Sequence, residues 1–123
     1  MKNQNTARAN GPITGVGQVI AADVNTATVA VFTLAAAPTV AGHNCTFEFS
    51  CDSSNGVDGT WYQMRATRTN AATLEAATGV LAATPVYGWR APCAGFRWVR
   101  VRCTAHTSGA ANWIIRGATG SVV

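Results

Sequence analysis

The sequence predicts an all-β fold, an antiparallel β-sandwich or jelly-roll-like domain that follows an extended N-terminal arm. Short segments rich in β-branched and aromatic residues recur along the chain, and clusters of Gly, Asn and Ser separate them. Two of these segments also alternate strictly between apolar and polar residues. A chain of 123 residues has room for one domain with a two-layer core. We therefore expect an arm over residues 1–16 and a single sandwich domain over residues 17–123.

The arm, which begins MKNQNTARANGP, is polar throughout. Such a segment cannot bury apolar surface of its own, so we expect it to be flexible or ordered by a partner. It also lacks the apolar h-region of a signal peptide. The longest apolar stretch starts at Val29, but Thr33 and Pro38 interrupt it and it is too short to cross a bilayer. The sequence thus predicts neither export nor a membrane partner.

Two strands and a long turn are expected next. Residues 26–34, TATVAVFTL, are rich in β-branched residues and suit a buried strand. Residues 44–51, NCTFEFSC, alternate as a half-buried strand does. Residues 52–59, DSSNGVDG, predict a hairpin loop; their oxygens could hold calcium, but the spacing and terminal Glu of a calcium loop are missing. The side chains expected on the apolar face of the alternating strand are Cys45, Phe47, Phe49 and Cys51.

The second half of the chain continues this pattern. We expect strands at TWYQMRAT (60–67), near residues 72–75, and at PVYGWR (85–90), with one helical turn possible within residues 69–83. In FRWVRVRCTA (96–105), Val99, Val101 and Cys103 alternate against Trp98, Arg100 and Arg102. The turn HTSG (106–109) then leads into ANWIIRGA, the last strand. Seven or eight short strands at regular intervals are typical of a sandwich or jelly roll.

The four cysteines match no metal template. No Cys-x-x-Cys or His-x-x-x-His pair is present, so the sequence predicts no metal and no other cofactor. A chain without an export signal folds in a reducing compartment, where free, buried thiols are the default. A cross-strand bridge stays open as an alternative, either Cys45 with Cys103 or Cys51 with Cys93.

The charge pattern favours protein contacts over catalysis. Only 11% of the residues are charged, the net charge is +4, and eight of the nine cations are arginine. A weakly charged surface suits a protein that packs in a lattice or an oligomer, and the absence of a dense basic run argues against a nucleic-acid partner. His43 and His106 fall in predicted turns, where histidines are usually solvated, and no catalytic motif surrounds them. The sequence therefore predicts a protein that is not an enzyme.

One stretch of the chain combines arginine with large aromatic residues, a composition typical of protein-interface hot spots. We expect Trp61 and Trp113 to lie in or near the core. Trp89 and Trp98 are the better surface candidates, and they offer an alternative role, since exposed indole rings can also stack on sugars. The predicted interface consists of Trp89, Arg90, Arg97, Trp98, Arg100 and Arg102.

Two segments, CTFEFSCDSSNGVDGTWYQM and PCAGFRWVRVRCTAHTSGAANWIIRG, suggest a family. Together they resemble a recurrent pattern in small β-sandwich virion proteins of tailed bacteriophages, either head decoration (cement) proteins or modules of tails and fibres. The resemblance covers about Cys45 to Gly117. The four cysteines and the high alanine content depart from the family pattern.

The resemblance implies an antiparallel sandwich, no catalysis and assembly through surface contacts. It does not choose between head and tail. Our first hypothesis is a capsid decoration protein, a dimer or trimer that bridges and stabilises major capsid protein subunits in a virion assembled in the host cytoplasm. The alternative is a tail, fibre or baseplate module that binds host-surface carbohydrate through Trp89 and Trp98.

Overall fold

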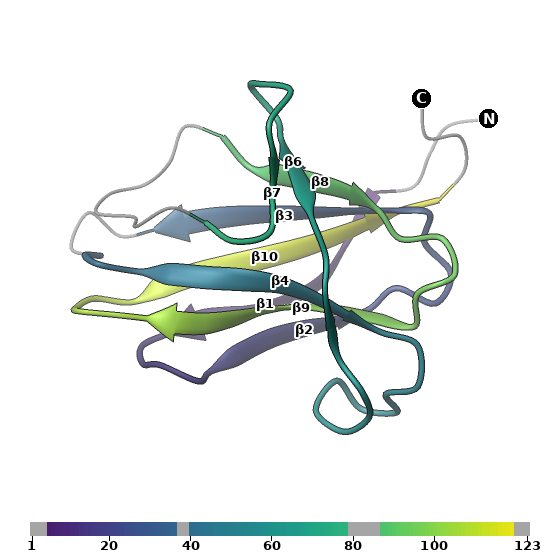
Figure 1. Cartoon of the computed structure of the whole chain (residues 1–123), viewed down its shortest axis with the longest axis horizontal. Helices are drawn as coiled ribbons and strands as arrows, with labels where there is room; N and C mark the ends of the chain where they lie inside the picture. Colours follow the sequence, from purple (N-terminus) through teal and green to yellow (C-terminus); the bar gives the residue numbers. More distant parts are fainter. Residues whose placement is uncertain (1–4, 37–39, 79–86, 120–123) are drawn as a thin grey trace.

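The computed structural model describes residues 5–36, 40–78 and 87–119. Within these ranges the chain forms ten β-strands and no helix, and the strands build two antiparallel sheets packed face to face (Figure 1). The predicted all-β sandwich is confirmed. No helix capable of crossing a membrane occurs in these ranges.

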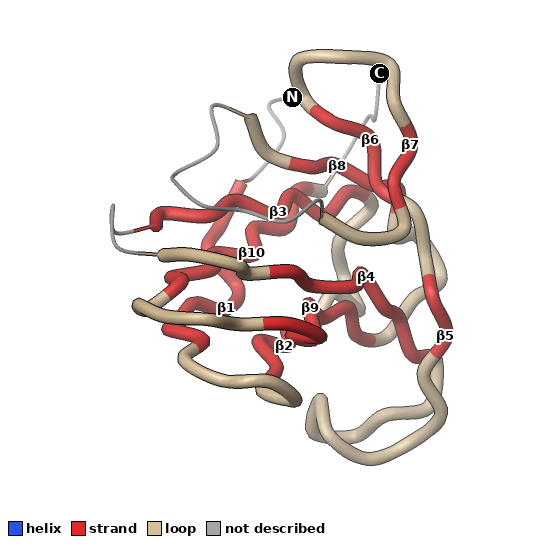
Figure 2. The backbone as a smooth tube through the Cα atoms, turned by 60° about the vertical axis from the view of Figure 1, so that its left-hand side comes forward, coloured by secondary structure: helices blue, strands red, loops and turns tan. Residues whose placement is uncertain are grey.

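The two sheets differ in size, and they form the two layers visible in Figure 2. Because the strands of each layer come from distant parts of the sequence, most contacts in the core are long-range. The six-stranded sheet has the order β1 (Asn5–Ile13), β10 (Ala111–Ala118), β3 (Val29–Ala36), β8 (Trp89–Pro92), β6 (Ala66–Arg68) and β7 (Leu74–Glu75). The four-stranded sheet has the order β2 (Val19–Asp23), β9 (Trp98–Ala105), β4 (Asn44–Ser50) and β5 (Tyr62–Gln63).

An aromatic cluster fills the space between the layers. Phe47 of the smaller sheet faces three rings of the larger one, with centroid distances of 5.0 Å to Phe32, 5.5 Å to Trp89 and 6.5 Å to Trp113. All four side chains are fully buried. Tilted and edge-on aromatic pairs add about 1 kcal/mol each to the free energy gained from burial, so this cluster holds the sheets together.

The N-terminal arm proves to be part of the sheet. Residues 5–13 form β1, which pairs with β10 along its whole length apart from a bulge between Ala7 and Ala9. The predicted arm is therefore wrong for these residues, while residues 1–4 lie outside the described ranges. Backbone hydrogen bonds to β10 order a strand that has little apolar surface, and Ile13 anchors its end in the core. Pro12 is tolerated because β1 is an edge strand.

The remaining expectations agree with the structure in most places. The alternating segments form β4 and β9, the last segment forms β10, and β7 lies within the strand expected near residues 72–75. Cys51 does not share the apolar face of β4, because the strand ends at Ser50 and Cys51 is exposed. Residues 79–86, which include part of the strand expected at 85–90, lie outside the described ranges.

Candidate functional site

The predicted interface is divided between two opposite faces of the molecule. Arg90 projects from β8 on the outer face of the larger sheet, whereas Arg100 and Arg102 project from β9 on the outer face of the smaller one. Arg97 is exposed and immediately precedes β9. Since outer faces of a sandwich point away from each other, the structure does not bring Arg90 together with the other arginines.

Trp89 is a core residue, contrary to the prediction that placed it on the surface. Its side chain is fully buried and its ring lies 5.6 Å from that of Trp113. The indole N–H donates a hydrogen bond to the Glu75 carboxylate at 3.0 Å, which satisfies the polar atom that burial would otherwise leave unpaired. Neighbouring residues of a strand face opposite ways, so Arg90 points outward because Trp89 points inward.

The arginines of β9 are paired within the fold. Glu48 of β4 accepts from Arg100 at 2.8 Å and from Arg102 at 3.2 Å. The Arg100 guanidinium also lies 4.0 Å above the ring of Trp61, a cation–π contact that holds the end of the loop between β4 and β5 against the sheet. One carboxylate is therefore shared by two cations on this face, which offsets one of their two positive charges and leaves less charge for a partner than the sequence suggests.

Trp98 is half-buried on the same outer face. Gly56, in the loop after β4, has a φ of 85° and lies so close that a Cβ at this position would be 2.8 Å from the six-membered ring of the indole. The loop thus covers part of the Trp98 ring. Of the two tryptophans considered for sugar stacking, one is buried and the other is partly covered.

The covering loop, residues 51–61, is held by its own polar groups and projects at the lower edge of Figure 1. The Asp58 carboxylate accepts from the Ser53 hydroxyl at 2.9 Å and from the Ser54 amide and hydroxyl at 2.7 Å and 2.5 Å. These hydrogen bonds lower the pKa of Asp58 to about 2. The oxygens considered for calcium in the sequence are directed at N–H and O–H donors of the loop itself.

A row of side chains across the outer face of the larger sheet carries free cations. Register places Arg116 of β10 and Arg90 of β8 on either side of Val31 of β3. With strands about 4.8 Å apart, the two arginine backbones are separated by about 10 Å. Neither guanidinium forms an ion pair within the described ranges, where the salt bridges involve Arg68, Arg100 and Arg102. We call Arg90, Val31 and Arg116 the arginine row.

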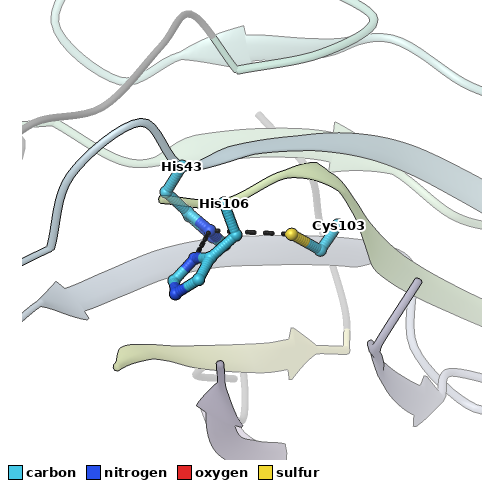
Figure 3. A group of neighbouring side chains, drawn as sticks. All are labelled: His43, Cys103 and His106. Atoms are coloured by element: carbon cyan, nitrogen blue, oxygen red, sulfur yellow. Dashed lines mark hydrogen bonds between the residues drawn. The ribbon is translucent and has the colours of Figure 1, made fainter. Parts of the chain in front are cut away.

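A pair of histidines lies at one end of the sandwich (Figure 3). His43 precedes β4 and His106 follows β9, and the Nδ1 atoms of the two rings are 3.0 Å apart. His43 is fully buried, so the expectation of a solvated turn histidine is wrong for this residue. The backbone bridge between Ala41 and Ser108 brings the two turns together, and that pairing has no signature in the local sequence.

The hydrogen-bond partners of the two rings determine which ring nitrogens carry a hydrogen. The Trp113 indole N–H donates to His43 Nε2 at 3.0 Å, so the hydrogen of neutral His43 must be on Nδ1. That hydrogen is donated to His106 Nδ1, and His106 Nε2–H donates to the Gly109 carbonyl at 2.7 Å. Burial, and secondarily the charge of His106, lowers the pKa of His43 to about 4. The His43 ring is therefore neutral at neutral pH in this arrangement.

Two thiols border the histidine pair. Cys45 Sγ lies 3.2 Å from His43 Nε2, and Cys103 Sγ lies 3.8 Å from His43 Nδ1. His43, Cys103 and His106 have donor atoms close enough together to surround a metal ion. A metal on His43 Nδ1 would force the ring hydrogen onto Nε2, where the Trp113 N–H already points. This donor set therefore fits a hydrogen-bonded chain better than a metal centre.

Comparison with known proteins shows a likeness in fold. No family model matches the sequence, and no curated protein matches it. Among solved structures, the SPBc2 prophage-derived protein YomS is similar, with a TM-score of 0.72 over 97% of this chain and 96% of that chain. The two sequences are 12% identical, so the likeness shows a shared fold.

Proposed function

We propose that this chain is a structural protein of a phage virion, and that it acts as a decoration (cement) protein on the capsid. The observation that carries the proposal is the fold shared with a prophage-derived protein over nearly the full length of both chains. The low charge content supports it, because only 11% of the residues are charged and such a surface suits close packing in a lattice.

The arginine row is the surface that we assign to the capsid contact. Glu48 and Glu75 bind arginines of the chain itself, and Asp52 and Asp58 accept hydrogen bonds from their own loop. The chain therefore has unpaired guanidinium groups but few free carboxylates to offer. A guanidinium binds a carboxylate through two parallel hydrogen bonds, so the matching surface on the capsid subunit carries Asp and Glu side chains.

Weak contacts of this kind are sufficient in a capsid. When a decoration protein contacts two adjacent subunits, the first contact holds it near the second site and so raises its effective concentration there. An oligomer has more such contacts and gains more affinity. We propose a dimer or trimer for that reason. Glycan binding in a tail or fibre has less support, because Trp89 is buried and Gly56 lies against the ring of Trp98.

Binding to particles tests the proposal. Purified chain would be mixed with phage heads that lack it, and bound protein would be measured by sedimentation and located by cryo-electron microscopy. Arg90→Glu reverses a charge in the arginine row, and Arg65→Glu, at another exposed position, is the matched control. We expect Arg90→Glu to weaken binding about tenfold or more, a loss of at least about 1.4 kcal/mol, while Arg65→Glu binds normally. Localisation on the tail, or equal binding by both variants, would overturn the assignment.

A further inference from the structure

Cys45 and Cys103 lie directly opposite each other on neighbouring strands. The pairing of β4 with β9 places their Cα atoms in register, and both side chains point into the core, where they are fully buried. They belong to the same inward-facing row as Phe47 and Val101, the next inward pair along these strands.

The backbone hydrogen bonds show which kind of opposed pair this is. Cys45 exchanges both of its backbone hydrogen bonds with Thr78, whose hydroxyl accepts at 2.9 Å and whose N–H donates at 2.9 Å. The Cys103 N–H donates to Gln18 and its carbonyl accepts from Gly17, each at 2.9 Å. The backbone hydrogen bonds of each cysteine go to residues on the side away from the other cysteine. The two therefore form a non-hydrogen-bonded pair of the antiparallel ladder. In such a pair the Cα atoms are about 4.5 Å apart, within the range that a disulfide spans.

The two thiols border the same imidazole ring, with Cys45 Sγ 3.2 Å from His43 Nε2 and Cys103 Sγ 3.8 Å from His43 Nδ1. Burial raises the pKa of Cys45 and of Cys103, so both groups are protonated thiols at neutral pH. Their reaction with an oxidant is slowed by burial and is restricted to small reagents.

We propose that Cys45 and Cys103 are a redox site, and that a small oxidant such as hydrogen peroxide links them in a cross-strand disulfide without rearranging the backbone. One sulfur attacks a peroxide oxygen, so that an S–O bond forms, the O–O bond breaks and water leaves with the thiol proton. The second sulfur then attacks the sulfenic sulfur, so that an S–S bond forms, the S–O bond breaks and the hydroxyl group leaves as a second water with the proton of the second thiol. The two sulfurs lose two electrons in total, and the peroxide gains them. This inference rests on the pairing of β4 with β9 and is independent of the proposed function.

The other two cysteines lack this geometry. Cys51 is exposed and its sulfur lies 3.8 Å from the Gly95 carbonyl, whereas Cys93 is buried and its backbone N–H donates to Thr28. They do not occupy paired positions in the described strands. Of the two bridges left open by the sequence, the structure therefore favours Cys45 with Cys103.

The experiment uses the full chain with Cys51→Ser and Cys93→Ser, so that only the opposed pair can react. The folded, reduced protein is treated with hydrogen peroxide and digested without reductant, and the peptides are identified by mass spectrometry. We expect a linked pair of peptides that contain Cys45 and Cys103, lighter by two hydrogen atoms and separable by reductant. The matched control adds Cys45→Ser, which should give oxygen addition at Cys103 and no intramolecular link.

A refolding experiment exposes the two thiols to the oxidant before they are buried. The same variant is unfolded, refolded in a glutathione redox buffer and analysed by the same peptide mapping and by thermal unfolding. A link with native circular dichroism and a raised melting temperature supports the proposal by either route. Oxygen addition without a link in the folded protein, together with refolding that gives no link, would overturn it. A link that forms only with loss of the native spectrum would overturn it as well.

Discussion

Acidification should weaken the fold through the histidine pair. His43 is fully buried and neutral, and its two ring nitrogens are engaged by Trp113 and by His106. Protonation puts a hydrogen on Nε2, where the Trp113 N–H points, and one hydrogen bond of the chain is lost. In the unfolded chain the same ring takes up a proton freely. The folded state therefore loses stability over the pH range in which only the unfolded chain binds this proton.

The size of the effect follows from the two pKa values. The pKa of His43 falls from an ordinary 6.5 to about 4 in the folded protein. Because the folded value is the lower one, the contribution to stability is complete above 6.5 and is lost as the pH falls toward 4. Each pKa unit corresponds to about 1.4 kcal/mol, so the loss amounts to about 3 kcal/mol. Carboxylates with lowered pKa values, such as Asp58, add to the loss only at lower pH.

Urea unfolding at a series of pH values, from about pH 7 to about pH 4.5, measures the free energy of unfolding in this range. Two variants separate His43 from its neighbour. His43→Phe removes the titrating ring and keeps an aromatic side chain, so its stability should depend less on pH, although it is lower at neutral pH. His106→Asn keeps an acceptor for the His43 N–H and should retain most of the dependence.

A wild-type stability that is flat between pH 6.5 and pH 5 would refute this reasoning. The same conclusion would follow if His43→Phe showed the full wild-type slope, because another group would then be taking up the proton. Nuclear magnetic resonance of the ring carbons supplies an independent check, since it reports the titration of each histidine directly.

The remaining predictions concern packing and redox chemistry. Gly56→Ala should destabilise the fold by about 2 kcal/mol more than Gly17→Ala in thermal unfolding, because both have positive φ but only Gly56 lies against an indole ring. Glu48→Gln should cost about 2 kcal/mol in urea unfolding, since the two arginines that it pairs lose their counter-charge. A link between Cys45 and Cys103 closes a loop of 58 residues (103 minus 45) and should add up to about 4 kcal/mol by equilibrium unfolding.

The strands with the clearest alternation were predictable because one of their faces is the core. In β4 and β9 the apolar side chains, such as Phe47 and Val101, must point inward. Buried positions and apolar residues therefore both recur at every second residue. The opposed position of Cys45 and Cys103 was only one of two options, since register depends on which residues pair. β1 was not predictable from composition, because backbone pairing with β10 orders it.

His43 illustrates a second limit. Its neighbours in sequence are those of a surface turn, and the partners that bury it, Trp113 and His106, come from the far end of the chain. No local pattern reports such a contact. At Cys51 the local pattern itself was misleading. The alternation of apolar and polar residues predicts burial as far as Phe49, but β4 ends at Ser50, so the pattern no longer predicts which way Cys51 points.

The prediction grouped Trp89 with Arg90 on one surface, although the sequence itself contained the reason against that grouping. Trp89 and Arg90 are consecutive residues of a strand, and consecutive residues of a strand cannot face the same partner. The same rule places the Trp98 side chain with Arg100 and Arg102, as observed. Applied to every strand, it leaves Arg90 on the outer face of the larger sheet, and the register of β3 then adds Arg116 to the same row. A candidate surface on a sandwich is therefore defined first by which residues of each strand point outward, and only then by their chemical type.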